Sequence, residues 1–203
     1  MTKTMTIGDR KLSFRYSKEL QAQADWLEGV LADIAKERGN DFFAPDRTIQ
    51  LGWSTLKLVE VKGTLQLQEP DFDGDPEDDT RNQLGTTLTV IAQQNDVVNP
   101  LGVTPVPIHF LEKVVFVEGS MEEEEVFFQR SELKEGDSGW TLKLLDNPKQ
   151  DGPYDWIFVY DLLQIRPEAM KILTLPVGYI AVFLGETLDA ILDENDRKVY
   201  TAS

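Results

Sequence analysis

Three aspartates, Asp71, Asp73 and Asp75, have the spacing of the first, third and fifth ligands of a twelve-residue calcium-binding loop. The later positions depart from that pattern. Pro76 takes the sixth position, where the sharp turn needs a glycine, and Asn82 takes the twelfth, where a glutamate binds through both oxygens. We therefore expect an exposed, solvated acidic loop with little to bury, and we predict no metal ligand in the chain. Weak cation binding is the alternative.

Glu122 to Glu125 are four consecutive carboxylates between two segments with the composition of strands. Paired carboxylates can perform general acid and base catalysis, but consecutive residues of a strand alternate between its faces, so at most two of the four would converge. A solvated surface is therefore the favoured interpretation. The alternative is a small hydrolase that binds a divalent cation through these glutamates or through the Asp71–Asp79 loop.

Ser138 lies in a Gly136-Asp137-Ser138-Gly139 string that is similar to the surroundings of the nucleophile in trypsin-like serine proteases. Such a serine needs an imidazole to take its proton and a carboxylate to orient that imidazole. His109, the one histidine, lies in a proline-rich apolar stretch, and Trp140 replaces the glycine expected next. We therefore predict a tight turn that enters a strand, in which the Asp137 and Ser138 side chains bond nearby backbone and glycine has positive φ. No residue is predicted to be catalytic.

The composition restricts the classes of partner. The chain has 203 residues, 36 acidic and 20 basic side chains and a net charge of −16, which repels nucleic acid and anionic membranes. It contains no cysteine, so disulfides and thiolate chemistry are excluded. It also lacks a phosphate-binding loop, a nucleotide fingerprint and any apolar run long enough to cross a membrane. We expect a soluble cytoplasmic protein without a cofactor.

Large aromatic side chains gather near the middle of the second half of the chain, interleaved with five aspartates. The aromatic residues are Trp140, Tyr154, Trp156 and Tyr160, and the aspartates are Asp137, Asp146, Asp151, Asp155 and Asp161. Burial in a core and exposure at a protein-binding surface are about equally favoured. In a binding surface the aromatic side chains would supply contact energy, and the carboxylates would steer a basic protein partner.

A long helix is the clearest element that the sequence predicts. Ser17 can cap it, basic residues and Gly39 mark its end, and one apolar face runs through it, so we expect a helix over residues 17–38. Apolar residues then alternate with polar ones around residues 12–16, 49–53, 56–58 and 65–67, which predicts a strand before the helix and a three-stranded antiparallel meander after it.

Further strands are expected over residues 114–117, 126–128, 140–144 and 179–183, with a short helix at 167–172 and a charged turn at 189–197. Residues 86–91 are rich in β-branched side chains and predict a strand. The spacing of Leu84, Leu88, Ile91 and Val98 fits a helix as the alternative.

These elements together predict an α+β fold, mainly antiparallel sheet with one long N-terminal helix and a short C-terminal helix. Pro100, Pro105 and Pro107 mark a stiff connection. We therefore expect an N-terminal subdomain over residues 1–105 and a second subdomain over 106–203, with one continuous domain as the alternative.

Two segments resemble a known family. They are Arg130-Ser-Glu-Leu-Lys-Glu-Gly136-Asp137-Ser138-Gly139-Trp140 and Leu173-Thr-Leu-Pro176-Val-Gly178. They are similar to the bacterial immunity proteins called immunity protein thirty-three, with an Asp-Ser-Gly-Trp turn after a strand and a downstream Leu-Pro-x-Gly. The resemblance covers about residues 85–185. Asp137, Ser138, Gly139, Trp140, Pro176 and Gly178 carry it.

The resemblance implies a cytoplasmic protein, encoded beside a secreted toxin, that protects its producer by binding the toxin. It transfers no catalytic residue. Our first hypothesis is thus a non-enzymatic binding protein whose partner is a basic toxin domain and whose binding residues include Tyr154, Trp156 and Tyr160. The metal-dependent hydrolase and an oligomeric structural module are the alternatives. The toxin, its contact face and the oligomeric state do not follow from the sequence.

Overall fold

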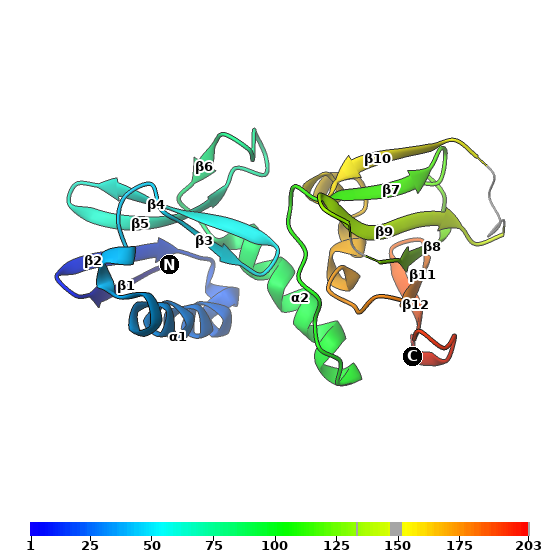
Figure 1. The fold of residues 1–203 in the computed structure, drawn as a ribbon, viewed down its shortest axis with the longest axis horizontal. Helices are drawn as coiled ribbons and strands as arrows, with labels where there is room; N and C mark the ends of the chain where they lie inside the picture. The colour runs from blue at the N-terminus through cyan, green and yellow to red at the C-terminus, as the bar shows by residue number, and fades with distance from the viewer. Residues whose placement is uncertain (133, 147–151, 203) are drawn as a thin grey trace. The chain divides into compact units, whose positions relative to one another are not determined.

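The computed structural model describes residues 1–132, 134–146 and 152–202 (Figure 1). The chain divides into two compact units, Met1–Ala92 and Gln93–Ser203. Each unit contains a mostly antiparallel sheet and helical segments, which confirms the α+β class. The boundary between the two units lies after Ala92, within a helix that spans Gly85–Leu101 and before Pro105 and Pro107 of the proline-rich connection. The division into subdomains at residue 105 stays a prediction.

The sheet of the first unit has the strand order β1-β2-β5-β4-β3, and β6 pairs with β5. The strands are β1 (Thr2–Ile7), β2 (Arg10–Arg15), β3 (Thr48–Leu51), β4 (Ser54–Val61), β5 (Thr64–Pro70) and β6 (Thr80–Arg81). The antiparallel meander β3-β4-β5 and the strand before the long helix are confirmed. β1, a strand that was not predicted, pairs antiparallel with β2. One face of this sheet carries the buried leucines of the core, among them Leu56, Leu58 and Leu67.

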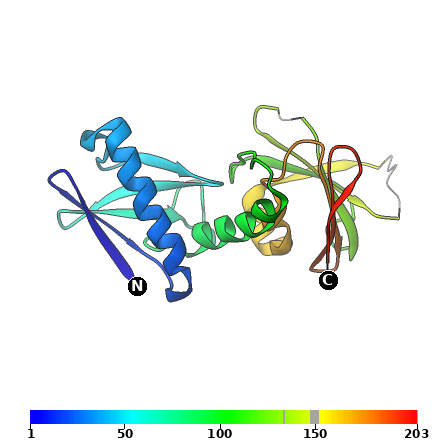
Figure 2. The same cartoon turned by 90° about the horizontal axis from the view of Figure 1, so that it is seen from below.

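The long helix α1 (Gln21–Arg38) follows a 3-10 turn at Lys18–Leu20. Its buried side chains Ala24, Leu27 and Leu31 are spaced as one helical face, as predicted, and α1 lies across the sheet (Figure 2). The cap expected from Ser17 is wrong in detail, because this side chain makes no capping hydrogen bond. The predicted helix is confirmed, and it depends on burial of its apolar face more than on its first turn.

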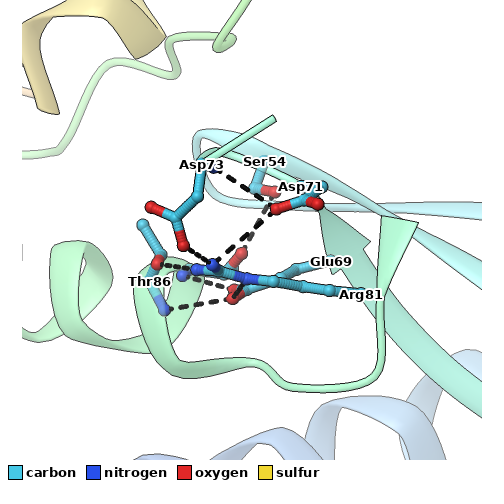
Figure 3. A network of polar contacts seen from close by, with 7 residues as sticks. Ser54, Glu69, Asp71, Asp73, Arg81 and Thr86 are labelled. Atoms are coloured by element: carbon cyan, nitrogen blue, oxygen red, sulfur yellow. Dashed lines mark hydrogen bonds and ion pairs between the residues drawn. The ribbon is translucent and has the colours of Figure 1, made fainter. Parts of the chain in front are cut away.

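The strand predicted over residues 86–91 is wrong. These residues belong to helix α2 (Gly85–Leu101), as the apolar spacing from Leu84 to Val98 had allowed. The carboxylate of Glu69, on β5, accepts the N–H groups of Thr86 at 3.3 Å and Thr87 at 2.8 Å (Figure 3). A negative charge at the free N–H groups of a first turn stabilises a helix. The cap comes from a residue seventeen positions away, so the local sequence does not reveal it.

The acidic segment after β5 is better packed than expected. Phe72 is buried, and its ring stacks on that of Trp53 at a centroid distance of 4.8 Å. Arg81 forms ion pairs with Glu69, Asp71 and Asp73 (Figure 3). The expectation of an exposed loop holds for the aspartates around Gly74, but it is wrong for Phe72, which anchors the segment to the core.

The second unit contains a seven-stranded sheet in the order β10-β7-β9-β8-β11-β12-β13. The strands are β7 (Lys113–Val117), β8 (Glu125–Arg130), β9 (Asp137–Leu144), β10 (Tyr154–Phe158), β11 (Ile180–Leu184), β12 (Thr187–Leu192) and β13 (Lys198–Thr201). The four strands predicted in this region are confirmed. The charged turn over 189–197 is wrong in its first part, because Ala190 and Ile191 are buried within β12. The Asp193 carboxylate closes the shorter turn that follows by accepting the N–H groups of Asn195 and Arg197.

Helical segments of the second unit lie on one face of its sheet (Figure 2). They are η3 (Val159–Asp161), α3 (Leu162–Ile165) and η4 (Pro167–Ile172). The predicted short helix at 167–172 is confirmed as a 3-10 helix that begins with proline. Phe128 packs edge-on against Trp140 and Phe183 in the core beneath these segments. Within the described chain, no helix is long and apolar enough to cross a membrane.

Candidate functional site

The Gly136-Asp137-Ser138-Gly139 turn is built from bonds between its own side chains and nearby backbone. The Asp137 carboxylate accepts the Gly139 N–H at 2.8 Å, and the Ser138 hydroxyl oxygen accepts the Trp140 N–H at 3.2 Å. Gly136 and Gly139 both have φ of 75°. The predicted turn is confirmed, although β9 already begins at Asp137.

The turn also inserts two residues into the pairing of β9 with β7. Lys113 lies opposite Asp137, whereas Val115, two residues on, lies opposite Thr141. The Ser138 hydroxyl bridges this bulge by donating to the Lys113 carbonyl at 2.6 Å. A bulge bends a strand and redirects its side chains. The turn therefore fixes where Lys113 sits on the neighbouring strand.

Arg130, at the end of β8, is the centre of the motif region and is 1% exposed. Its guanidinium donates to the carbonyls of Ser138 at 3.3 Å, Pro107 at 3.3 Å and Val106 at 3.4 Å, and to that of Leu175. Burial lowers the pKa of Arg130 to about 10, so the guanidinium keeps its charge at neutral pH. One side chain thus holds together the Asp-Ser-Gly-Trp turn, the proline-rich connection and the Leu-Pro-x-Gly segment.

The Leu-Pro-x-Gly segment packs against the same arginine through its backbone. The Gly178 N–H donates to the Arg130 carbonyl at 2.8 Å, and the Pro176 carbonyl accepts the Tyr179 N–H at 3.3 Å. Gly178 has φ of 89°, and a Cβ added there would lie 2.7 Å from the Glu194 Cβ. A side chain at this position is therefore disfavoured on both conformational and steric grounds.

Trp140 completes the link between the two segments. It is fully buried, and its indole N–H donates to the Leu173 carbonyl at 3.0 Å. The Arg130 guanidinium lies 5.6 Å from the centre of its ring. The structure thus brings together Asp137, Ser138, Gly139, Trp140, Pro176 and Gly178. Their contacts are those of an internal framework.

This geometry does not form a catalytic triad. The Ser138 hydroxyl is buried, and its proton points to a carbonyl oxygen instead of an imidazole. The His109 Nδ1 accepts the Leu111 N–H at 3.3 Å, and partial burial lowers the pKa of His109. Across residues 1–132, 134–146 and 152–202, no three histidine or carboxylate side chains are grouped so that they could hold a metal ion.

The remaining predicted site residues lie at the edge of the sheet. Tyr154 and Trp156 are 53% and 45% exposed on the edge strand β10. The Phe158 ring lies 5.2 Å from that of Trp156 and stacks at 5.4 Å on Tyr160, which follows β10 in η3. The sequence favours burial in a core and exposure at a surface about equally for these aromatic side chains. Trp140 is buried, whereas Tyr154 and Trp156 on β10 are exposed. Of the interleaved aspartates, Asp151 lies outside the described residues, as does Leu133 of the motif stretch.

Lys113 connects the buried motif to the exposed aromatic edge. Its backbone is held by Gly136 and Ser138, since its N–H donates to the Gly136 carbonyl at 3.0 Å. Its ammonium lies 3.9 Å from the centre of the Trp156 ring, within the range of a cation–π interaction. Sequence reasoning singled out neither Lys113 nor Arg130. For Arg130 a signal existed, because alternation along β8 places it on the same face as buried Phe128.

The glutamates at 122–125 are exposed, as predicted, and the backbone beneath them is held by a buried arginine. The Arg166 guanidinium donates to the carbonyls of Met121 at 3.1 Å and Glu123 at 2.8 Å, and to the Glu168 carboxylate at 2.6 Å. These contacts order the loop before β8. They leave the four carboxylates at the surface.

A model of the Imm33-like domain family matches residues 93–194, half of the chain. The chain therefore belongs to this immunity-protein-like family, whose members are generally non-enzymatic. The match begins where the second unit begins, ends at residue 194 within that unit, and contains both resemblance segments. No curated protein and no solved structure matches the chain.

Proposed function

We propose that the protein is a non-enzymatic, cytoplasmic immunity protein that neutralises a cognate toxin by binding it directly. Membership in the Imm33-like family over residues 93–194 is the observation that carries this proposal. The internal position of Ser138, whose hydroxyl serves the fold, supports binding over catalysis. The exposed aromatic side chains of β10 supply the kind of anchor that protein interfaces use.

The charge of the family domain supports a basic partner. Residues 93–203 contain twenty of the 36 acidic side chains but only nine of the 20 basic ones, a net charge of −11. Two of those nine, Arg130 and Arg166, are buried. An acidic surface accelerates association with a cationic protein, and this effect weakens as salt is added.

The proposal is tested with the toxin domain encoded beside this chain. Co-expression is expected to restore growth to cells that produce the toxin domain, and the purified proteins are expected to form a complex whose affinity falls as the salt concentration rises. Ser138→Ala serves as the catalytic control. Neutralisation lost in this variant while the complex persists would identify an enzyme, and absence of any complex would remove the proposed function.

A further inference from the structure

The two faces of the seven-stranded sheet differ in what covers them. Strand register places Phe128, Leu142 and Ala181 side by side on one face, where all three are fully buried beneath the helical segments. Among the described residues of the second unit, no helix lies on the opposite face (Figure 2). We call this second surface the open face.

A row of side chains crosses the open face from one strand to the next. Paired positions run from Trp156 on β10 through Val115, Thr141, Gln129 and Ile180 to Leu192 on β12. Trp156 is 45% exposed, and the other five are half-buried. Beside the row, Val182 pairs with Phe127, which extends the apolar surface. Four of the six positions in the row are apolar, although no helix among the described residues of the second unit packs against them.

The equivalent face of the first unit has the ordinary composition of a solvent-exposed sheet. Opposite the leucine-bearing side, register places Ser13 beside Gln66, and Gln66 beside Val59. Gln68 and Lys57 form the next pair, with Gln50 and Thr55 beyond. Polar residues therefore dominate this face, as expected for a face in contact with water. The apolar open face of the second unit is specific to that sheet.

The charge around the open face favours one kind of binding partner over another. Glu125, which pairs with Leu184, is exposed at one end of the open face, and Glu118 is exposed just beyond β7. Asp155 is exposed at the β10 edge, on the other side of the strand. Lys113 and Lys143, which lie on the face, are engaged by the Trp156 ring and by the Gln129 side-chain oxygen at 3.4 Å. A second copy would bring together two units that each carry a net charge of −11, so self-association is opposed. A cationic protein surface meets no such repulsion.

Resting on the proposed function, we infer that the open face of the second unit docks the cationic surface of the toxin, with Trp156, Ile180 and Val182 as its apolar contacts.

Strand addition at the β10 edge does not explain this docking. The N–H groups of Trp156 and Phe158 are bonded to the carboxylates of Asp155 at 2.8 Å and Asp161 at 2.9 Å. Charged side chains on an edge strand disfavour pairing with another chain. Contact is therefore made through side chains of the open face. The buried family motif contributes indirectly, by positioning Lys113. The Ser138 hydroxyl donates to the Lys113 carbonyl and the Gly136 carbonyl accepts the Lys113 N–H, and the Lys113 ammonium lies against the Trp156 ring.

The chain offers two matched pairs of variants for a test on the full-length protein. Val182→Lys changes the open face, and Val59→Lys makes the same change at a half-buried valine on the polar face of the first unit. Trp156→Ala is matched by Trp26→Ala on α1, since both tryptophans are 45% exposed. Thermal unfolding and sedimentation of each variant establish that it is folded.

Affinity for the toxin domain encoded beside this chain is measured by titration calorimetry. Central interface anchors cost about thirtyfold or more in affinity when truncated, so Val182→Lys and Trp156→Ala are each expected to weaken binding by about thirtyfold. Val59→Lys and Trp26→Ala are expected to change affinity by less than about threefold.

The outcomes separate this inference from the proposed function. If the unmodified chain binds the toxin domain and the open-face variants bind equally well, the docking surface is wrong and the function stands. If the unmodified chain does not bind, the function fails and the docking surface with it. Dimers of the unmodified chain that Val182→Lys dissociates would make a second copy the occupant and overturn the inference.

Discussion

Arg81 in the first unit and Arg130 in the second each hold several parts of the backbone together through one guanidinium, but they bind different chemical groups. The partners of Arg81 lie within 12 positions in the sequence, whereas those of Arg130 lie up to 45 positions away. Arg81, whose side chain is 27% exposed, meets the carboxylates of Glu69, Asp71 and Asp73. Arg130 is 1% exposed, and the hydrogen bonds of its described neighbourhood all go to backbone carbonyls. A carboxylate can be protonated within the ordinary pH range and a carbonyl cannot. The comparison therefore teaches which of the two arginine networks responds to pH.

Removal of Arg130 is expected to have the largest effect. Arg130→Met would leave the carbonyls of four backbone positions without their donor inside the protein. Breaking a buried charged network costs about 3–5 kcal/mol, and we expect a loss of that size in the free energy of unfolding. Urea denaturation followed by circular dichroism measures it. A loss below about 1 kcal/mol would mean that Arg130 does not brace the second unit.

Alanine substitutions at two glycines near Arg130 are expected to lower the free energy of unfolding by unequal amounts. Gly178→Ala combines positive φ with a contact at 2.7 Å to Glu194, and we expect it to cost about 3 kcal/mol. Gly136→Ala has positive φ but nothing within 4 Å of the new Cβ, and we expect about 1 kcal/mol. Thermal unfolding of both variants compares them. Equal losses would show that the Glu194 contact relaxes freely.

Within the Arg81 network, the pH response is expected to come from Glu69. Burial raises the pKa of Glu69, while Thr87 and Arg81 oppose the shift. A carboxyl with a raised pKa binds its proton more tightly when folded, so its contribution is fully present below about 4.5 and is lost as pH rises through the folded pKa. Relative to Glu69→Gln, the unmodified chain should therefore lose stability between pH 4.5 and neutral pH.

Urea denaturation at several pH values measures this difference. Arg130 gives the contrast, because its pKa of about 10 leaves it protonated throughout this range. Arg130 itself therefore adds no pH dependence to the difference between the unmodified chain and Arg130→Met, and any slope in that difference comes from Glu112, whose pKa is raised by burial and lowered by the Arg130 charge. A difference for Glu69→Gln that stayed constant or grew with pH would contradict the assignment to Glu69.

Loss of Asp73 should have the smallest effect in the series. Its side chain is 72% exposed, and Arg81 keeps its contacts with Glu69 and Thr86 when Asp73 is changed. Exposed ion pairs contribute less than about 1 kcal/mol, so Asp73→Asn is expected to change the free energy of unfolding by less than that. Urea denaturation at low and high salt checks it. A loss as large as that of Glu69→Gln would make the exposed carboxylate the principal partner of Arg81.

The parts of the fold that the sequence predicts are those fixed by neighbouring residues. The apolar periodicity of α1 and the glycines of the 136–139 turn act within a few positions, and both predictions are confirmed. α2 was missed because its cap is supplied by Glu69 on β5. β10 was missed because Tyr154, Asp155 and Trp156 are all exposed, so no apolar alternation marks the strand.

In the candidate site, too, contacts between neighbouring residues could be predicted from the sequence, and contacts between distant segments could not. The bonds of Asp137 and Ser138 to nearby backbone could be predicted because the donors lie two residues away. The role of Arg130 could not, because its partners are carbonyls of three separate segments and every residue type carries a carbonyl. Which aromatic side chains are exposed likewise depends on strand order, since Trp140 lies on a central strand and Trp156 on an edge.

The carboxylates bonded to the N–H groups of β10 have a consequence for the protein before it meets any partner. A sheet with an exposed apolar face and an unpaired edge strand can nucleate fibrils, because each added chain offers a new edge for the next chain to pair with. The carboxylates of Asp155 and Asp161 accept the N–H groups of Trp156 and Phe158 on β10, so these two edge groups are already hydrogen-bonded. The chain can therefore accumulate before it meets a partner without this edge of the sheet promoting polymerisation.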